Sequence, residues 1–441
     1  MCDLFFYSKR PVGVPNTVIY EKNRRKKTMK KILSILLASL LVLSCVAVLA
    51  SCGGNKNDPT DSASPSNGTA VTGGTIKIGI FEPATGANAA GGKQEVLGIR
   101  YAHSLKNTVT VAGKEYKIEL VEVDNQTEST TAPSAAQKLV SEGVSVVLGS
   151  YGSGAAMAGG EIFKKASIPA IGCSCTNPGV TSDNEFYFRV CYLDPFQGTV
   201  MAKFAKDSGV KKTLVLTELG DDYSTGLGKF FVAAAKENGL EYTENQFPKG
   251  NTDFTSFINT AKAENCDAIF APTSIEAAAL IVPQAKDLGY TGKILAGDTW
   301  ENSAIIDAAK GSSLYVACST FFDENDATAA DFVNGYKAWL NADSARLTNN
   351  GGNDIVAAVS ALGYDAYLTA IAALEKAEKV DGKAIRDALA SINSADKAVK
   401  GVTGDIFFDE IGDAERDTAF IKSVDTVNGA FKFEKKQTIA K

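Results

Sequence analysis

Short apolar runs alternate with amphipathic segments along the chain from about residue 75 onward. Residues 144–150 (VSVVLGS) are almost continuously apolar, which is typical of a strand buried on both faces of a parallel sheet. Residues 132–142 instead space their apolar side chains at the helical period. This first series predicts strands at 75–81, 116–124, 144–150, 168–174 and 186–192, and helices at 94–104, 132–142 and 155–166.

A second series of similar length starts with a predicted helix at 197–208. It predicts strands at 213–219, 240–247, 267–273, 293–299 and 314–320, and helices at 226–238, 254–264 and 276–288. The remaining pattern predicts helices at 329–340, 355–379 and 383–391, and a pair of strands around 405–408 and 419–424.

This alternation of strand and helix predicts an α/β fold, because parallel strands need a crossover helix between them. Two series of similar size predict two doubly wound parallel-sheet lobes. In such sheets, ligands bind beyond the carboxyl ends of the strands. The residues of interest are therefore those that follow Phe81, Gly149, Gly172, Leu219, Phe270 and Gly297.

The first residues of the chain read as an export signal. Lys30 and Lys31 precede an apolar stretch at 32–50, and small residues close it at Ser51. The run Leu-Ala-Ser-Cys that ends at Cys52 resembles the lipobox of bacterial lipoproteins, which implies that Cys52 carries the lipid. A transmembrane anchor is the alternative, since about 19 apolar residues can span a bilayer.

We therefore interpret residues 1–51 as an export signal and 52–74 as a flexible Gly/Ser/Pro-rich tether. Met29 begins MKKILSILL, a conventional start, so one interpretation is that residues 1–28 lie upstream of the true start. The expected location is the outer face of the cytoplasmic membrane, where the lipid would anchor the protein.

Composition excludes several classes of function. The chain has one histidine, His103, so it can build neither a His-rich zinc site nor an HExxH motif. The formal charge of −6 becomes −13 once the nine Lys/Arg and two Asp/Glu of residues 1–51 are removed. An acidic protein is a poor nucleic-acid partner. We expect no metal, no cofactor and no catalytic residue.

Five cysteines remain beyond the predicted signal and lipid site. An odd number does not make a complete disulfide framework. A buried hydrophobic role is the default, although an exported protein could pair Cys191 with Cys173 or Cys175. Disulfide formation among the five is left open by the sequence: Cys173, Cys175, Cys191, Cys266 and Cys318.

Two kinds of polar residue follow the predicted strands. Ser153 lies in a Gly/Ser loop that opens a helix, and Thr176 lies in a turn set by Pro178 and Gly179, so both suit an anion. Asp298 and Tyr223 follow strands of the second series and suit an ammonium group. Loop packing and helix capping are the alternative roles. Opposite poles across one cleft would match a zwitterion such as an amino acid.

The order and spacing of these segments resemble the branched-chain amino acid-binding proteins of ABC transporters, a periplasmic binding protein type I family. The resemblance extends from about residue 75 to the end of the chain and rests on runs that include IKIGIFEPATG, VSVVLGSYGS, IPAIGCSCTNPGVT, FYFRVCYLDPFQG, GDDYSTGLG, ILAGDTW and GVTGDIFFDE. It implies three hinge crossings, with lobe one at 75–195 plus 322–402 and lobe two at 196–321 plus 403–441.

The resemblance also implies roles for the strand-end residues. Ser153 and Thr176 would hold the ligand carboxylate, and Asp298 and Tyr223 would hold its ammonium group with help from the Ser174 carbonyl. The complete implied ligand-binding set is Tyr151, Ser153, Ser174, Cys175, Thr176, Tyr223, Thr273, Asp298 and Trp300.

The chain departs from the family at the side-chain pocket. Gly91 and Thr273 stand where the family often has aromatic residues, and Thr127 and Gly152 stand near the positions of a family cysteine pair. These losses put leucine, isoleucine and valine in doubt as ligands, and Tyr151 and Trp300 are candidates to compensate.

We therefore expect a lipid-anchored solute-binding protein that captures an amino acid, or a related small polar ligand, for an ABC permease. A sensory or regulatory ligand-binding domain of the same fold is the alternative. An enzyme has less support, because the chain has neither a GxSxG elbow nor a Walker loop.

Overall fold

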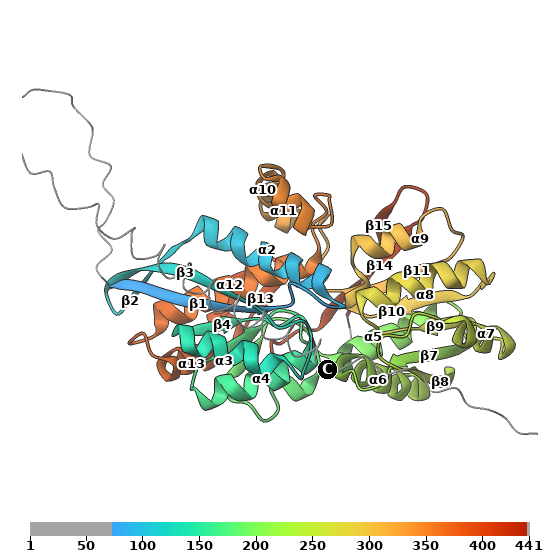
Figure 1. Cartoon of the computed structure of the whole chain (residues 1–441), viewed down its shortest axis with the longest axis horizontal. Coiled ribbons are helices and arrows are strands. Elements are labelled where there is room, and N and C mark those ends of the chain that lie inside the picture. The colour runs from blue at the N-terminus through green and yellow to red at the C-terminus, as the bar shows by residue number, and fades with distance from the viewer. Residues whose placement is uncertain (1–72, 439–441) are drawn as a thin grey trace, which may run out of the picture. The chain divides into compact units, whose positions relative to one another are not determined.

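The computed structural model describes residues 73–438 (Figure 1). The predicted export signal, the predicted lipidation site at Cys52 and nearly all of the predicted tether lie outside these residues. Within the described part of the chain, no helix is both long and apolar enough to cross a membrane.

The first lobe is built on a six-stranded sheet with the order β2-β3-β1-β4-β5-β6. Its strands are parallel except for β2, which runs antiparallel to β3. β1 lies in the middle, where Ile78 pairs with both Leu120 and Val146. The strands are β1 (Gly74–Glu82), β2 (Thr108–Val111), β3 (Lys114–Asp124), β4 (Val146–Leu148), β5 (Ala170–Gly172) and β6 (Tyr187–Arg189).

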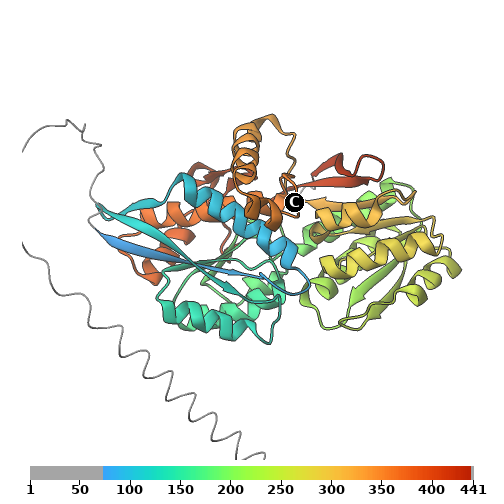
Figure 2. The same ribbon diagram turned by 45° about the horizontal axis from the view of Figure 1, so that its top comes forward.

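The second lobe is built on a seven-stranded sheet with the order β15-β14-β11-β10-β9-β7-β8. Five strands are parallel, whereas β14 runs antiparallel to both β11 and β15. The pair β14–β15, red in Figure 2, forms one edge of this sheet. The strands are β7 (Lys212–Glu218), β8 (Glu241–Phe247), β9 (Ala268–Phe270), β10 (Lys293–Ala296), β11 (Val316–Thr320), β14 (Thr418–Asp425) and β15 (Ala430–Thr438).

Helices pack against each sheet and against one another. In the first lobe α2 packs on α12, and α3 packs on α4 (Figure 1). The close contact of α2 with α12 depends on Gly98, because a Cβ there would lie 1.9 Å from the Ser360 carbonyl oxygen. These helices are α2 (Ala89–Leu105), α3 (Ala132–Glu142), α4 (Ser153–Lys165) and α12 (Ala358–Lys376).

In the second lobe α5 packs on α6, and α8 packs on both α7 and α9. These helices are α5 (Asp194–Asp207), α6 (Asp222–Asn238), α7 (Thr255–Ala263), α8 (Ile275–Asp287) and α9 (Ser303–Ala309). Near the end of the chain, α10 (Ala330–Asn341), α11 (Ser344–Asn349) and α13 (Gly382–Ala390) pack with α2 or α12.

The chain crosses between the sheets three times: after β6, after β11, and between the β12–β13 hairpin and β14. The α/β fold class with two parallel-rich lobes is thus confirmed. The residue limits of the lobes remain a prediction.

Strands are present near both predicted positions, 405–408 and 419–424, but they do not pair with each other. β13 (Gly404–Ile406) pairs with β12 (Val399–Gly401), and β14 pairs with β11 and β15. The sequence pattern missed β15 because it is rich in lysine and largely exposed, so it has no buried apolar run. Two short elements, the four-residue β2 and the six-residue α11, were not predicted either.

Candidate functional site

The loop after β5 is anchored by a buried arginine. Arg189 on β6 is fully buried and pairs with Asp413 at 2.5 Å, which neutralises a charge that burial would otherwise disfavour. Its guanidinium also donates to the carbonyl oxygens of Cys175 (2.8 Å) and Asn177 (2.6 Å). These bonds fix the backbone on both sides of Thr176.

The predicted carboxylate-binding residues lie close together in this loop and at the start of α4. Ser153 is the first residue of α4, and its hydroxyl accepts a hydrogen bond from the Asn177 backbone N–H at 3.2 Å. The Thr176 Oγ1 atom is buried and receives no hydrogen bond from the described residues. A helix N-terminus with an unused buried hydroxyl beside it offers donors to an anion.

The predicted ammonium-binding residues meet in the second lobe. Tyr223, in the first turn of α6, donates its hydroxyl to Asp298 Oδ1 at 3.0 Å. The Asp298 backbone N–H donates to Gln197 Oε1 at 2.8 Å. Burial raises the pKa of Asp298 to about 6. A carboxylate desolvated in this way gains most from a cationic partner.

The two predicted aromatic residues of the site, Tyr151 and Trp300, lie in different places: Tyr151 packs against Gly91 of the first lobe, and Trp300 lies in the core of the second lobe. A Cβ at Gly91 would lie 2.3 Å from the Tyr151 ring, so the ring fills the space where a side chain at residue 91 would stand. Trp300 is fully buried in the core of the second lobe, and its indole N–H donates to Thr273 Oγ1 at 3.3 Å. Thr273 also accepts the Thr299 hydroxyl through its carbonyl at 2.8 Å.

The side chains of Ser174 and Cys175 turn away from these poles. The Ser174 hydroxyl donates to Glu95 Oε1. Cys175 belongs to the hydrophobic core that also holds Phe81 and Val147, and burial raises the pKa of its thiol to about 12. The two side chains are thus engaged elsewhere, and the Cys175 carbonyl oxygen is held by Arg189. The five cysteines within residues 73–438 are free and buried.

Contacts between the two lobes surround this group of residues. The Ile275 backbone N–H donates to Asn88 Oδ1 at 3.0 Å, and Asn177 Nδ2 donates to the Asp222 carbonyl at 2.8 Å. Lys249 also forms an ion pair with Glu128. These bonds join the loops after β1, β3 and β5 of lobe one to the starts of α6 and α8 and to the loop after β8 in lobe two, so the two lobes are in contact.

Several polar residues near the poles were not predicted. Asp194 and Gln197 start α5, and burial raises the pKa of Asp194 to about 7. Glu82 and Glu95 are buried behind Tyr151 and Ser174. Glu82 ends β1, so the strand-end rule could have found it, whereas the other three lie on helices and carry no such signal.

His103, Thr127 and Gly152 lie among neighbours that give each of them a structural role. His103 Nε2 lies 3.2 Å from the Ile118 carbonyl oxygen, and its ring packs edge-on against Tyr367. Thr127 and Gly152 are neighbours, because a Cβ at Gly152 would lie 2.5 Å from Thr127 Cγ2. The two residues that the resemblance places near a family cysteine pair are thus adjacent in the fold.

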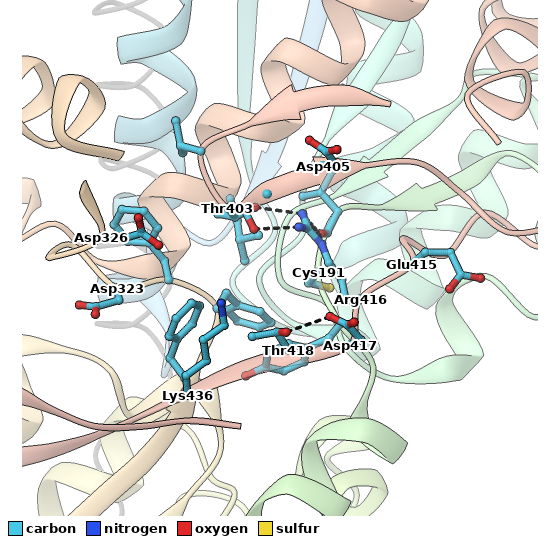
Figure 3. A pocket seen from close by; sticks show the side chains of 18 of the residues that line it. Cys191, Asp323, Asp326, Thr403, Asp405, Glu415, Arg416, Asp417, Thr418 and Lys436 are labelled. Carbon is cyan, nitrogen blue, oxygen red and sulfur yellow. Dashed lines mark hydrogen bonds between the residues drawn. The ribbon is translucent and has the colours of Figure 1, made fainter. Parts of the chain in front are cut away.

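A cavity of about 420 Å³ lies at the three crossings and shares no lining residue with the predicted ligand-binding set (Figure 3). Its walls include residues 190–192, 321–323 and 415–418, one segment from each crossing. Arg416 donates to the carbonyl oxygens of Val190 (3.0 Å) and Thr403 (2.8 Å), which ties the first crossing to the third. This region is the connection between the lobes.

Comparisons with known proteins agree with this architecture. A family model described as periplasmic binding protein matches residues 75–428. A Leu/Ile/Val-binding protein homolog from Brucella melitensis is 26% identical over 347 residues, covering 77% of this chain and 88% of the relative.

Two solved structures are also similar. A leucine-binding protein from Thermotoga maritima is 33% identical, with a TM-score of 0.74, covering 82% of this chain and 99% of the other. A branched-chain amino acid transporter substrate-binding protein from Streptococcus pneumoniae, solved in complex with isoleucine, is 28% identical with a TM-score of 0.70, covering 83% of this chain and 99% of the other.

Proposed function

Because the chain belongs to the periplasmic binding protein family, in its branched-chain amino acid-type ABC transporter branch, we propose that it captures an amino acid outside the cytoplasm and delivers it to an ABC permease. Its relatives are binding proteins of transporters rather than enzymes. The single observation that carries the proposal is that one lobe offers hydrogen-bond donors for a carboxylate and the other lobe offers a carboxylate for an ammonium group, while the two lobes are in contact. Thr176 offers an unused buried hydroxyl, and Asp298 offers a desolvated carboxylate.

In the proposed complex, the ligand carboxylate lies at the start of α4 near Ser153 and Thr176. Its ammonium group lies against Asp298, Tyr223 and the Ser174 carbonyl. Charge-assisted hydrogen bonds at both ends would offset the loss of water from the zwitterion. The ligand would lie between the lobes and hold them together, as hinge closure requires.

The ligand's side chain is proposed to contact Tyr151, whose ring fills the space beside Gly91. The Thr273–Trp300 hydrogen bond lies on the second lobe and adds a polar group to that region. A small apolar or hydroxylated side chain fits this mixture better than a charged one. Leucine, isoleucine, valine, alanine and threonine are the first ligands to test.

Calorimetry with the twenty amino acids tests the proposal. We expect binding of at least one small aliphatic or hydroxylated L-amino acid, and loss of binding when its carboxylate or ammonium group is blocked. Correctly folded protein that binds none of the twenty would contradict an amino-acid ligand. Binding of an uncharged or purely anionic molecule instead would contradict the two-pole arrangement.

Lipid anchoring is a separate part of the proposal and rests on the run Leu-Ala-Ser-Cys at residues 49–52. Expression in a bacterial host should place the protein in the membrane fraction. Cys52→Ser should release it from that fraction, or leave an unprocessed precursor, whereas Cys45→Ser should not. Equal partitioning of both variants would contradict lipidation at Cys52.

A further inference from the structure

Two carboxyl groups face each other behind the proposed ligand site. Glu82 is the last residue of β1, and Glu95 lies on α2. Glu82 is 2% exposed to solvent and Glu95 is 0% exposed. The two carboxyl groups interact directly, because each one shifts the pKa of the other. Together with the Cys173 thiol, their ligand atoms lie within 4.8 Å of one another.

Each carboxyl group uses one oxygen to hold a residue of the proposed site. Glu82 Oε2 accepts the Tyr151 backbone N–H at 2.7 Å, and Glu95 Oε1 accepts the Ser174 hydroxyl. The other two oxygens, Glu82 Oε1 and Glu95 Oε2, receive no hydrogen bond from an N–H or O–H group of the described residues. Buried acceptors without a donor are unfavourable, and one proton held between these two oxygens would satisfy both.

No positive charge faces the pair to stabilise a double negative charge. Neither glutamate takes part in an ion pair among residues 73–438. The titratable groups that face the pair are all acids from the surrounding elements: Cys173, Cys175, Tyr151, Tyr187 and Asp298. Burial raises the pKa of Glu95 to about 7, and burial together with Glu95 raises that of Glu82 well above its usual value.

We propose that Glu82 and Glu95 share a single proton and that this pair positions Tyr151 and Ser174 for the ligand, so that loss of the proton loosens the site. The effect on ligand affinity rests on the proposed function, whereas the shared proton does not. The direction follows from the raised pKa values. The stability that the protonated pair gives the folded protein is fully present only below the usual pKa of a glutamate, and it is lost progressively as the pH rises from there through the raised pKa of the pair.

The geometry gives the reason for the loosening. When the proton leaves, two like charges lie close together in a buried region. Their repulsion would separate α2 from β1 and from the loop after β5. Tyr151 and Ser174 would then shift, because each is hydrogen-bonded to one of the two carboxyl groups.

The first test needs no ligand. Infrared spectra of the full protein in H₂O and D₂O should show a protonated carboxyl band that persists at neutral pH and disappears at alkaline pH. Glu82→Gln and Glu95→Gln should each remove this band, because the glutamine amide replaces the protonated group. A wild-type spectrum without such a band at neutral pH would overturn the proposal, even if neither variant folds.

Thermal unfolding between pH 6 and 9 gives a second ligand-free readout. Wild-type stability should fall as the pH rises, and either Gln variant should flatten this dependence. Glu122→Gln is the matched control, because Glu122 is an exposed carboxylate paired with Arg100 on α2 and should leave the slope unchanged. Parallel slopes for the wild type and both Gln variants would contradict the shared proton.

A bound metal is the competing explanation for two glutamates beside a thiol. Elemental analysis of the purified protein decides between them: we expect less than one zinc in ten molecules. One equivalent of zinc that is lost in Glu82→Gln and in Cys173→Ser would overturn the shared proton.

Calorimetry with L-isoleucine and L-threonine then tests the positioning role. Wild-type affinity should fall about tenfold or more between pH 7 and 9, and Glu95→Gln should retain its affinity over this range. A pH-independent wild-type affinity together with the expected infrared band would overturn the positioning role alone. If neither amino acid binds, the amino-acid proposal fails, while the infrared and unfolding results still decide the shared proton.

Discussion

At the scale of single residues, buried polar atoms define the proposed site. Asp298 has little solvent to stabilise its charge. Its carboxylate accepts the Tyr223 hydroxyl, and its backbone N–H donates to Gln197 Oε1 on α5. Thr176 has a buried hydroxyl that the described residues do not use. A buried carboxylate is stabilised by a ligand cation, and a buried hydroxyl without a partner is stabilised by a ligand anion. A zwitterion supplies both groups.

Asp298→Ala should weaken ligand binding by about 2–5 kcal/mol, because it leaves a buried ammonium group without its carboxylate. Calorimetry measures this change. In the wild type, the pKa of Asp298 near 6 predicts that affinity falls as the pH drops below about 6, since the ammonium group needs the ionised form. Asp298→Asn should abolish this acid-side decrease. A tenfold or smaller loss in Asp298→Ala would show that Asp298 does not face the ligand.

Ser153→Ala should weaken binding by a smaller amount, about 1–2 kcal/mol, because a neutral hydroxyl contributes less than a charge. The same calorimetric measurement compares the two variants. Ser141→Ala, an exposed serine on α3 whose hydroxyl bonds within its own helix, is the control and should bind normally. A larger loss in Ser153→Ala than in Asp298→Ala would reverse the proposed roles.

At the scale of elements, loops after parallel strands bring the site residues together. The loop after β5 has its conformation because Arg189, on the next strand, binds its carbonyl oxygens and also pairs with Asp413. Asp413 lies more than two hundred residues away, in the segment before β14. No local sequence pattern indicates that Asp413 pairs with Arg189. The position of the loop could therefore be predicted from the sequence, but the residues that hold it could not.

Arg189→Met should destabilise the protein by about 3–5 kcal/mol, because it leaves the Asp413 carboxylate buried without a partner. Chemical denaturation measures the difference. Arg100→Met is the matched control: Arg100 pairs with Glu122 on the surface, and exposed pairs contribute about 0–1 kcal/mol. Equal effects of the two substitutions would mean that the buried pair does not support the loop.

At the scale of the whole molecule, three crossings and a small number of contacts determine how the lobes meet. Asn88 Oδ1 and the Ile275 N–H form a buried hydrogen bond across the cleft. The Lys249–Glu128 ion pair is more exposed and is expected to contribute little. A bond that forms only when the lobes meet stabilises the closed state and therefore raises the affinity for a ligand that needs closure.

Asn88→Ala should lower ligand affinity by about 1–3 kcal/mol, because the Ile275 N–H then has no partner in the closed state. The free energy of unfolding should change less, since the open state is unaffected. Small-angle X-ray scattering should also show a smaller ligand-induced compaction. Asn238→Ala is the control, because Asn238 bonds within α6 and not across the cleft. Unchanged affinity in Asn88→Ala would mean that this bond does not contribute to closure.

The sequence by itself determined the α/β fold class, the order of the main strands and the strand-end positions of Ser153, Thr176, Tyr223 and Asp298. It could do so because buried parallel strands leave continuous apolar runs, and because the carboxyl ends of such strands meet at one edge. Tertiary structure alone decided which distant side chains touch. The Arg189–Asp413 pair, the Tyr151 ring over Gly91 and the facing Glu82 and Glu95 depend on contacts between elements far apart in the chain, and local hydrophobic patterns carry no information about such contacts.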